Sequence, residues 1–269
     1  MAESRRDLLV GPGASLALKL VLTPLLVGAA SLAGRRWGSE VGGWLVGIPF
    51  TTGPIAFFLA LNPGARFAAD AAVGIMAGVA SQAAFCLAYA WVAQKQGWTP
   101  SLLAATAAFL LATALLNLVV WPAVVVFIAL ILVLVVAIRA MPGRGSIVTV
   151  QIDYPPWDIP ARIVVVTAFV VVLTTAAPLL GPHLAGLLSP FPLVAAALAT
   201  FAHRIGGVAP ALGVLRGLLL GLFAAAGFFF VLAELLPGQG IAIAFAAAIL
   251  VALALQGISL GLGRRLGLA

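Results

Sequence analysis

The amino-acid sequence predicts an all-α, polytopic integral membrane helix bundle, and three properties of the chain lead to this class. Hydrophobic residues make up 64% of the 269 residues, charged residues make up 8%, and the mean hydropathy is +1.24. A soluble domain carries roughly 25% charged residues, because it needs them to cover its surface in water. The apolar residues also form runs of about 20 residues, which is the length that crosses a bilayer as a helix. These properties exclude a soluble enzyme, a nucleic-acid-binding domain and a disordered chain.

The distribution of charge fits a multi-pass protein of the cell membrane, that is, an inner or plasma membrane. The net charge is +7, and the basic residues occur singly or in pairs between apolar runs. Lys and Arg take such positions in the loops that flank membrane spans. We therefore expect the lipid bilayer, and no nucleic acid, as a partner. The single cysteine, Cys86, lies in an apolar run and is expected to be a small buried hydrophobe, so we predict no disulfide and no metal site.

The residues up to Ile138 are expected to cross the membrane five times. The first three spans are expected at 14–34, which we expect to be retained as a span and not cleaved as a signal peptide, at 43–61 and at 69–93. The uncharged stretch from Ser101 to Ile138 would form a helix of about 57 Å, nearly twice the roughly 30 Å hydrocarbon core. Asn117 and Trp121-Pro122 supply turn chemistry inside this stretch. It is therefore predicted to fold back once, giving spans at 101–117 and 121–138.

A polar loop, 139–160, separates these spans from the rest of the chain. Residues 146–152 in this loop have β character, and 154–157 is typical of an anchor at the membrane surface. The loop is too short for a domain and is predicted to be a lid or a linker. The spans that follow it are expected at 162–180, 185–202, 209–233 and 240–262, which brings the total to about nine.

The chain also matches itself at an offset of 143 residues without gaps. Pro49 falls on Pro192 and Phe58 on Phe201. Four glycines of the first half fall on glycines of the second, where about one match is expected by chance, and such a register indicates duplication. The matched glycines are Gly43 and Gly186, Gly64 and Gly207, Gly74 and Gly217, and Gly78 and Gly221. The sequence therefore predicts two homologous four-helix repeats, 1–118 and 161–269, joined by a linker helix and loop at 119–160.

The unmatched span at 121–138 decides the relative orientation of the two repeats. Four spans followed by one extra crossing make the second repeat start from the opposite face of the membrane. Repeats inverted in this way are common in secondary transporters. Charge does not decide the matter, because a nine-span chain with its N-terminus outside and an eight-span chain with its N-terminus inside both leave the same excess of Lys and Arg on the inner side.

Both repeats contain a span that glycine and proline interrupt at the same place. The interruption covers 47–54 in the first repeat and 189–192 in the second. Unwound backbone exposes N–H and C=O groups, and paired broken spans indicate a binding site near the membrane midplane. The candidate solute-binding residues are Pro49, Thr51, Thr52, Gly53, Pro54, Pro190 and Pro192. The alternative is that glycine and proline only kink these helices to improve packing.

Polar side chains inside the predicted spans are few. Thr51 and Thr52 are the best candidates for function, because the second repeat offers only Val194 and Ala195 at the corresponding positions. This asymmetry would let one repeat bind a solute while the other forms a wall. The remaining polar residues are expected to form hydrogen bonds between helices; they include Ser81, Gln82, Thr113 and Gln256. Small residues spaced four apart, Gly74 with Gly78 and Gly217 with Gly221, predict close helix packing.

Three cations lie within predicted spans, namely Lys19, Arg162 and Arg216. They either extend to lipid headgroups or contribute to a pathway for anions. The chain places no carboxylate near the centre of a predicted span, so we expect no proton relay based on carboxylates. Nothing in the sequence assembles a catalytic constellation. We therefore predict that the protein is not an enzyme and that it needs no cofactor.

The second repeat carries a pattern that resembles a known family. It consists of Ala185-Gly186-Leu187, Phe191-Pro192, a loop with His203, Leu215-Arg216 and the run Phe228-Phe229-Phe230. The pattern is similar to the small four-span GlpM-type membrane proteins, and the first repeat is similar in weaker form through Gly43-Trp44-Leu45 and Pro49. The chain would then be a fused duplicate of that family. The resemblance implies a link with exopolysaccharide (alginate) production. Four-span proteins that work as antiparallel pairs would need a linker helix such as 121–138 once they are fused.

Two functions are expected on these grounds. The first is a small transporter or permease for an unknown solute, and the second is a non-transporting accessory protein that supports envelope or exopolysaccharide biosynthesis. A polar cavity that reaches Thr51 and Thr52 would favour the transporter. A solid core with a large apolar outer patch would favour the accessory protein. Besides lipid and a small solute, a second copy of the chain in a homodimer is an expected partner.

Overall fold

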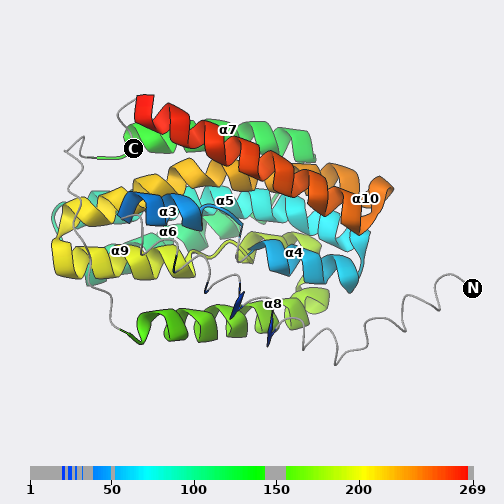
Figure 1. The fold of residues 1–269 in the computed structure, drawn as a ribbon, viewed down its shortest axis with the longest axis horizontal. Coiled ribbons are helices and arrows are strands. Elements are labelled where there is room, and N and C mark those ends of the chain that lie inside the picture. Colours follow the sequence, from blue (N-terminus) through cyan, green and yellow to red (C-terminus); the bar gives the residue numbers. More distant parts are fainter. Residues whose placement is uncertain are drawn as a thin grey trace, which may run out of the picture.

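The computed structural model is a bundle of helices, and its described residues contain no strand (Figure 1). The described residues are 39–49, 52–142 and 156–265, with single positions between 20 and 32. Lys19, Thr51, most of the predicted first span and the β-like stretch 146–152 lie outside them. The helices are α3 (Ser39–Val46), α4 (Thr52–Leu61), α5 (Ala65–Ala93), α6 (Trp98–Leu116), α7 (Ala123–Ala140), α8 (Asp158–Leu188), α9 (Leu193–Gly206) and α10 (Val208–Arg265).

Five segments of the described residues are long and apolar enough to cross a membrane. They are α5, α6, α7, Thr174–Gly206 and Val208–Ser259. The all-α prediction is confirmed for the described residues, and the apolar helices agree with an integral membrane protein. The predicted turn between α6 and α7 is also confirmed: the N–H of Asn117 closes α6 on the carbonyl of Thr113 at 2.9 Å, and Pro122 caps α7.

Two of the helices change direction at a glycine. Helix α10 has 58 residues, so a straight helix would be about 87 Å long, far more than a bilayer core of roughly 30 Å. Gly240 has φ 78° and ψ 170°, a conformation that glycine adopts without steric cost. Figure 1 shows α10 turning back on itself. Gly181 plays the same part in α8, with φ 77° and ψ 164°, and Pro182 then starts the next helical stretch.

The interior of the bundle is built around α5 and the first part of α10, which pack against each other. The outer helices α6 and α7 bury only one stripe each, with buried residues spaced by three or four positions, as one face of an α-helix requires. Their other faces expose large apolar side chains such as Leu103, Leu111 and Ile128. An apolar surface of this kind suits lipid as the surrounding solvent.

Glycines set the distance between the helices at the centre. A Cβ atom on Gly186 of α8 would collide with the Ala71 carbonyl and would lie 2.9 Å from Cα of Gly74 in α5. A Cβ atom on Gly221 of α10 would collide with the Trp44 carbonyl and would lie 2.8 Å from Cα of Gly47. Both crossings therefore bring backbone against backbone, and the predicted packing role is confirmed for Gly74 and Gly221.

Candidate functional site

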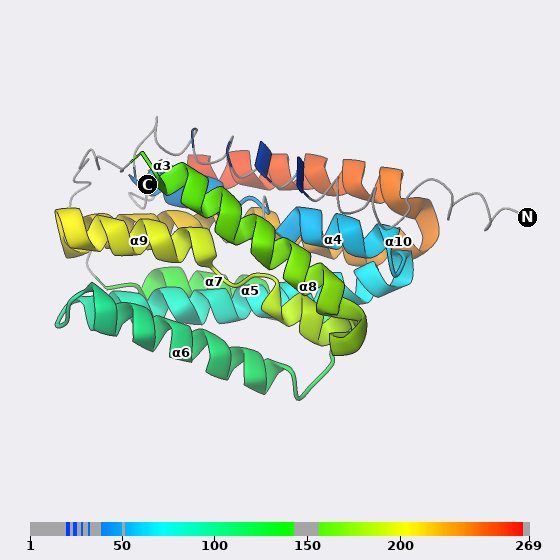
Figure 2. The same ribbon diagram turned by 90° about the horizontal axis from the view of Figure 1, so that it is seen from below.

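Two helices are broken near the middle of the bundle, as glycine and proline predict. Helix α3 ends at Val46 and α4 begins at Thr52, while α8 ends at Leu188 and α9 begins at Leu193. Proline has no N–H to donate and disfavours helical backbone at the residue before it, so Pro190 and Pro192 cannot continue α8. Figures 1 and 2 show α4 and α9 extending in opposite directions from the middle of the bundle.

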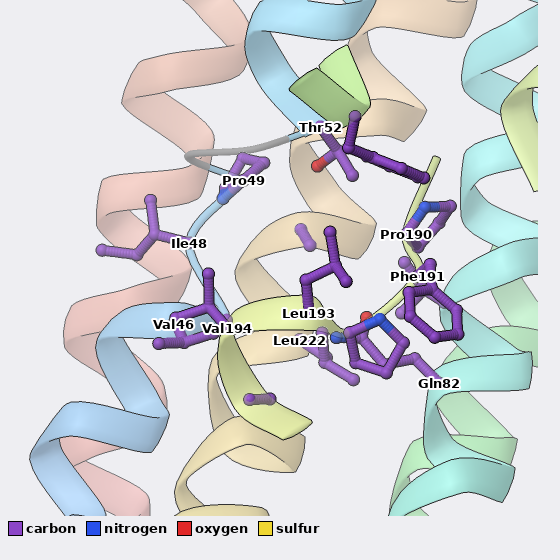
Figure 3. Close-up of a pocket in the computed structure, with 16 residues that line it drawn as sticks. Val46, Ile48, Pro49, Thr52, Gln82, Pro190, Phe191, Leu193, Val194 and Leu222 are labelled. Carbon is purple, nitrogen blue, oxygen red and sulfur yellow. The ribbon is translucent and has the colours of Figure 1, made fainter. Parts of the chain in front are cut away.

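The two breaks lie next to each other and line a shared cavity (Figure 3). Its volume is about 40 Å³. One water needs roughly 10–15 Å³ measured in this way, so the cavity has room for a few waters or a very small solute. The lining residues are Val46, Gly47, Ile48, Pro49 and Thr52 at the first break, Pro190, Phe191, Pro192, Leu193, Val194 and Ala195 at the second, and Val79, Gln82, Phe169, Leu222 and Ala225 from neighbouring helices.

Two side chains bring hydrogen-bonding groups to this cavity. Thr52 begins α4, and Gln82 extends from α5 into the space between the breaks (Figure 3). Each is 7% exposed, and neither side chain forms a hydrogen bond within the part of the chain that the structure describes. Neither polar group is among the fully buried side-chain atoms that have no partner, so each keeps some access to the cavity. The hydroxyl and the amide are therefore available to a solute or to water in the cavity.

The backbone adds partial charges of both signs. The first N–H groups of α4 and α9 and the last C=O groups of α3 and α8 lie at the two breaks. Some of them pair within the breaks: the Gly53 N–H donates to the Pro49 carbonyl at 2.8 Å, and the Leu193 N–H donates to the Phe191 carbonyl at 2.8 Å. A helix start carries a partial positive charge and a helix end a partial negative charge. Among the described residues that line the cavity, none has an ionisable side chain.

The predicted site residues divide into those that reach the cavity and those that do not. Pro49, Thr52, Pro190 and Pro192 line it, and Thr51 lies outside the described residues. Gly53 and Pro54 are buried in the first turn of α4 but are not part of the lining. A Cβ atom on Gly53 would lie 3.8 Å from the ring of Phe228, so this glycine belongs to the packing of α4.

Gln82 is the functional candidate that sequence reasoning missed. It was expected to join two helices by a hydrogen bond, and this expectation is wrong for Gln82 as well as for the hydroxyls of Ser81 and Thr113, which have no partner among the described residues. The 143-residue offset offered a signal, because Gln82 falls on Ala225 just as Thr52 falls on Ala195. The expectation is confirmed only for Gln256, whose Nε2 donates to the Trp44 carbonyl at 2.8 Å.

Of the three predicted cations, only Arg216 has a described side chain, and it does not line the cavity. Arg216 is half-buried in α10, and its Nη2 donates to the carbonyl of Pro142 at 2.8 Å. It therefore ties α10 to the residues that follow α7. Arg162 lies in α8, but its side chain is not among the described side chains, and Lys19 lies outside the described residues.

Comparison with known proteins leaves the function to be argued from this geometry. No protein-family model, no curated protein and no solved structure matches the chain. The likeness to GlpM-type proteins therefore stays a prediction that depends on its motifs. Within the described ranges, no three His, Cys, Asp or Glu side chains are grouped so that they could hold a metal ion.

Proposed function

We propose that this protein is a small transporter or permease whose solute binds where the two broken helices meet. The main support for a transporter is the cavity between the breaks, where the side chains of Thr52 and Gln82 have no hydrogen-bond partner among the described residues. Polar groups inside an apolar bundle normally pair with each other, because leaving them unpaired is costly. A solute in the cavity would give these two groups a partner, and secondary transporters place their binding sites at broken helices near the midplane.

The glycine contacts support two repeats related by a two-fold axis. Gly186 lies against the carbonyl of Ala71. At the 143-residue offset Gly186 corresponds to Gly43 and Ala71 corresponds to Val214, and Gly43 lies against the carbonyl of Val214. In the same way, the contact of Gly78 with the Leu187 carbonyl corresponds to the contact of Gly221 with the Trp44 carbonyl. Such reciprocal contacts are typical of an interface between two copies related by a two-fold axis.

The cavity lining and the helix boundaries support the same relation. Gly64 precedes α5 with φ 137°, and Gly207, at the matching position, precedes α10 with φ 82°. Six pairs of lining residues are related by the offset: Gly47 and Pro190, Ile48 and Phe191, Pro49 and Pro192, Thr52 and Ala195, Val79 and Leu222, and Gln82 and Ala225. The proposed axis therefore passes through the cavity.

In the proposed arrangement the chain crosses the membrane nine times, and the repeats at 1–118 and 161–269 are inverted. The opposite directions of α4 and α9 support the inversion (Figures 1 and 2). Helix α7 has no counterpart and serves as the linker that allows it. Each repeat then descends from a four-span GlpM-type protein, and the function involves no enzymatic step.

The inversion predicts that the N-terminus lies outside the cell membrane and the C-terminus inside. An odd number of crossings requires opposite sides, and the excess of Lys and Arg selects the inner side for the C-terminus. Reporter tags at Ser4 and after Ala269, compared in the same cells, would measure this. An N-terminus on the same side as the C-terminus would overturn both the nine crossings and the inversion.

A test of transport that needs no knowledge of the solute uses the accessibility of Thr52. In a Cys86→Ala background, Thr52→Cys should react with a membrane-impermeant thiol reagent added from either side, because a transporter opens its site to each side in turn. Ser81→Cys is the matched control, since Ser81 is 0% exposed and does not line the cavity. If Thr52→Cys is as unreactive as Ser81→Cys, the result contradicts the transporter function and favours the accessory function in envelope or exopolysaccharide biosynthesis.

A further inference from the structure

The polar side chains of the cavity come from one of the two repeats. Thr52 and Gln82 come from the first repeat, and their counterparts at the 143-residue offset are Ala195 and Ala225. All four residues line the cavity. The hydroxyl and the amide of the lining therefore come from the first repeat, while the matching positions of the second repeat offer only methyl groups, to which Leu222 adds further apolar surface. A bound molecule therefore meets polar side chains from the first repeat only.

The polar side chains of the cavity suit an uncharged molecule. A threonine hydroxyl and a glutamine amide can each donate and accept a hydrogen bond. The helix starts and helix ends at the breaks contribute partial charges of opposite sign, which offset each other. Moving an ion into an apolar site without an opposite charge is far more costly than moving a neutral amide or alcohol. Since none of the described lining residues is ionisable, an ion would have no such partner here.

We propose, on the basis of the transporter function above, that the solute is a small uncharged molecule with a polar end and an apolar end, of the short-chain amide or alcohol class. Its polar end forms hydrogen bonds with Thr52 and Gln82, and its apolar end packs against Ala195, Ala225 and Leu222. The cavity volume of about 40 Å³ restricts the molecule to a few non-hydrogen atoms. Acetamide has this size and this division between a polar and an apolar end.

The proposal predicts that the full chain in lipid vesicles carries acetamide faster than protein-free vesicles do. Gln82→Leu and Thr52→Val should each slow this flux by about tenfold, the factor that corresponds to one lost hydrogen bond of about 1.4 kcal/mol. Ser81→Ala is the matched control and should leave the flux unchanged, because Ser81 is buried next to Gln82 in the sequence but does not line the cavity. Urea, which is polar throughout, should cross more slowly than acetamide. Stopped-flow light scattering measures these rates.

Other probes separate failure of this proposal from failure of the proposed function. Formate has a similar size and carries a charge, so a flux of formate without acetamide would overturn the uncharged solute and leave the transporter in place. An acetamide flux that Gln82→Leu does not slow would also overturn the binding mode. Gln82→Met, which keeps the length of the side chain without the amide, serves if the leucine variant does not fold. If none of the probes crosses, the result depends on Thr52→Cys. When Thr52→Cys reacts from both sides, the absence of flux overturns the proposed solute class alone. When it does not, the absence of flux overturns the transporter function as well.

Discussion

Gly221→Val should prevent the central helices from reaching their native separation. A Cβ atom at Gly221 meets the backbone of Trp44 and Gly47, so no side-chain rotation can relieve the collision. Overpacking usually costs 1–3 kcal/mol, and we expect at least about 3 kcal/mol because a whole helix must move. In lipid, close packing replaces the hydrophobic effect as the force that holds helices together, so this loss is not recovered elsewhere.

The measurement is the thermal denaturation of the purified protein in detergent. Gly257→Val is the matched control in the same helix, because a Cβ atom there has no described atom within 4 Å, and its effect should stay within about 0.5 kcal/mol. Gly78→Val should destabilise the protein as strongly as Gly221→Val, since a Cβ atom at Gly78 lies 2.5 Å from the Leu187 carbonyl. Equal stability of the Gly221 and Gly257 variants would contradict the close approach of α3 and α10.

Phe109→Ala is expected to have the second largest effect. Phe109 is 0% exposed and packs edge-on against Phe191 with a centroid distance of 5.2 Å. In soluble proteins a buried Phe→Ala change costs about 3–5 kcal/mol, part of which is the transfer of the ring out of water. A lipid-exposed reference state removes most of that transfer part, so we expect about 2 kcal/mol from lost packing.

A second consequence of Phe109→Ala concerns the cavity, because Phe191 lines the second break. Loss of its ring partner should loosen this wall and admit solutes larger than acetamide. Leu103→Ala on the same helix is the control, since Leu103 is 67% exposed on the lipid side and its removal should change neither stability nor solute size. A Phe109 variant as stable as the Leu103 variant would exclude a packing role for the ring.

The breaks and turns were predictable because glycine and proline act locally. Pro190, Pro192 and Pro122 stop helices through their own missing N–H and their fixed backbone angle, whatever the surroundings. The ends of the long helices were less predictable. The third span was expected to begin at residue 69, whereas α5 begins at Ala65, because the helix extends by one turn beyond the apolar run and includes the charged Arg66.

The side chains that face the cavity could not be chosen from the sequence alone. Ser81 and Gln82 are adjacent on α5, yet only Gln82 lines the cavity. In a helix with one apolar stripe, periodicity would show which side faces inward. Helix α5 is apolar on all sides and is buried along most of its length, so periodicity gives no direction. The positions of α8, α9 and α10 decide it, and these come from distant parts of the chain.

The correspondence of Gln82 with Ala225 in the cavity lining has a genetic consequence in the proposed arrangement. In an assembly of two identical subunits, every mutation appears twice, so an amide gained on one wall is gained on the other as well. A single gene that encodes both walls removes this constraint, and each codon can change alone. Specificity can then evolve on one wall while the other wall stays the same.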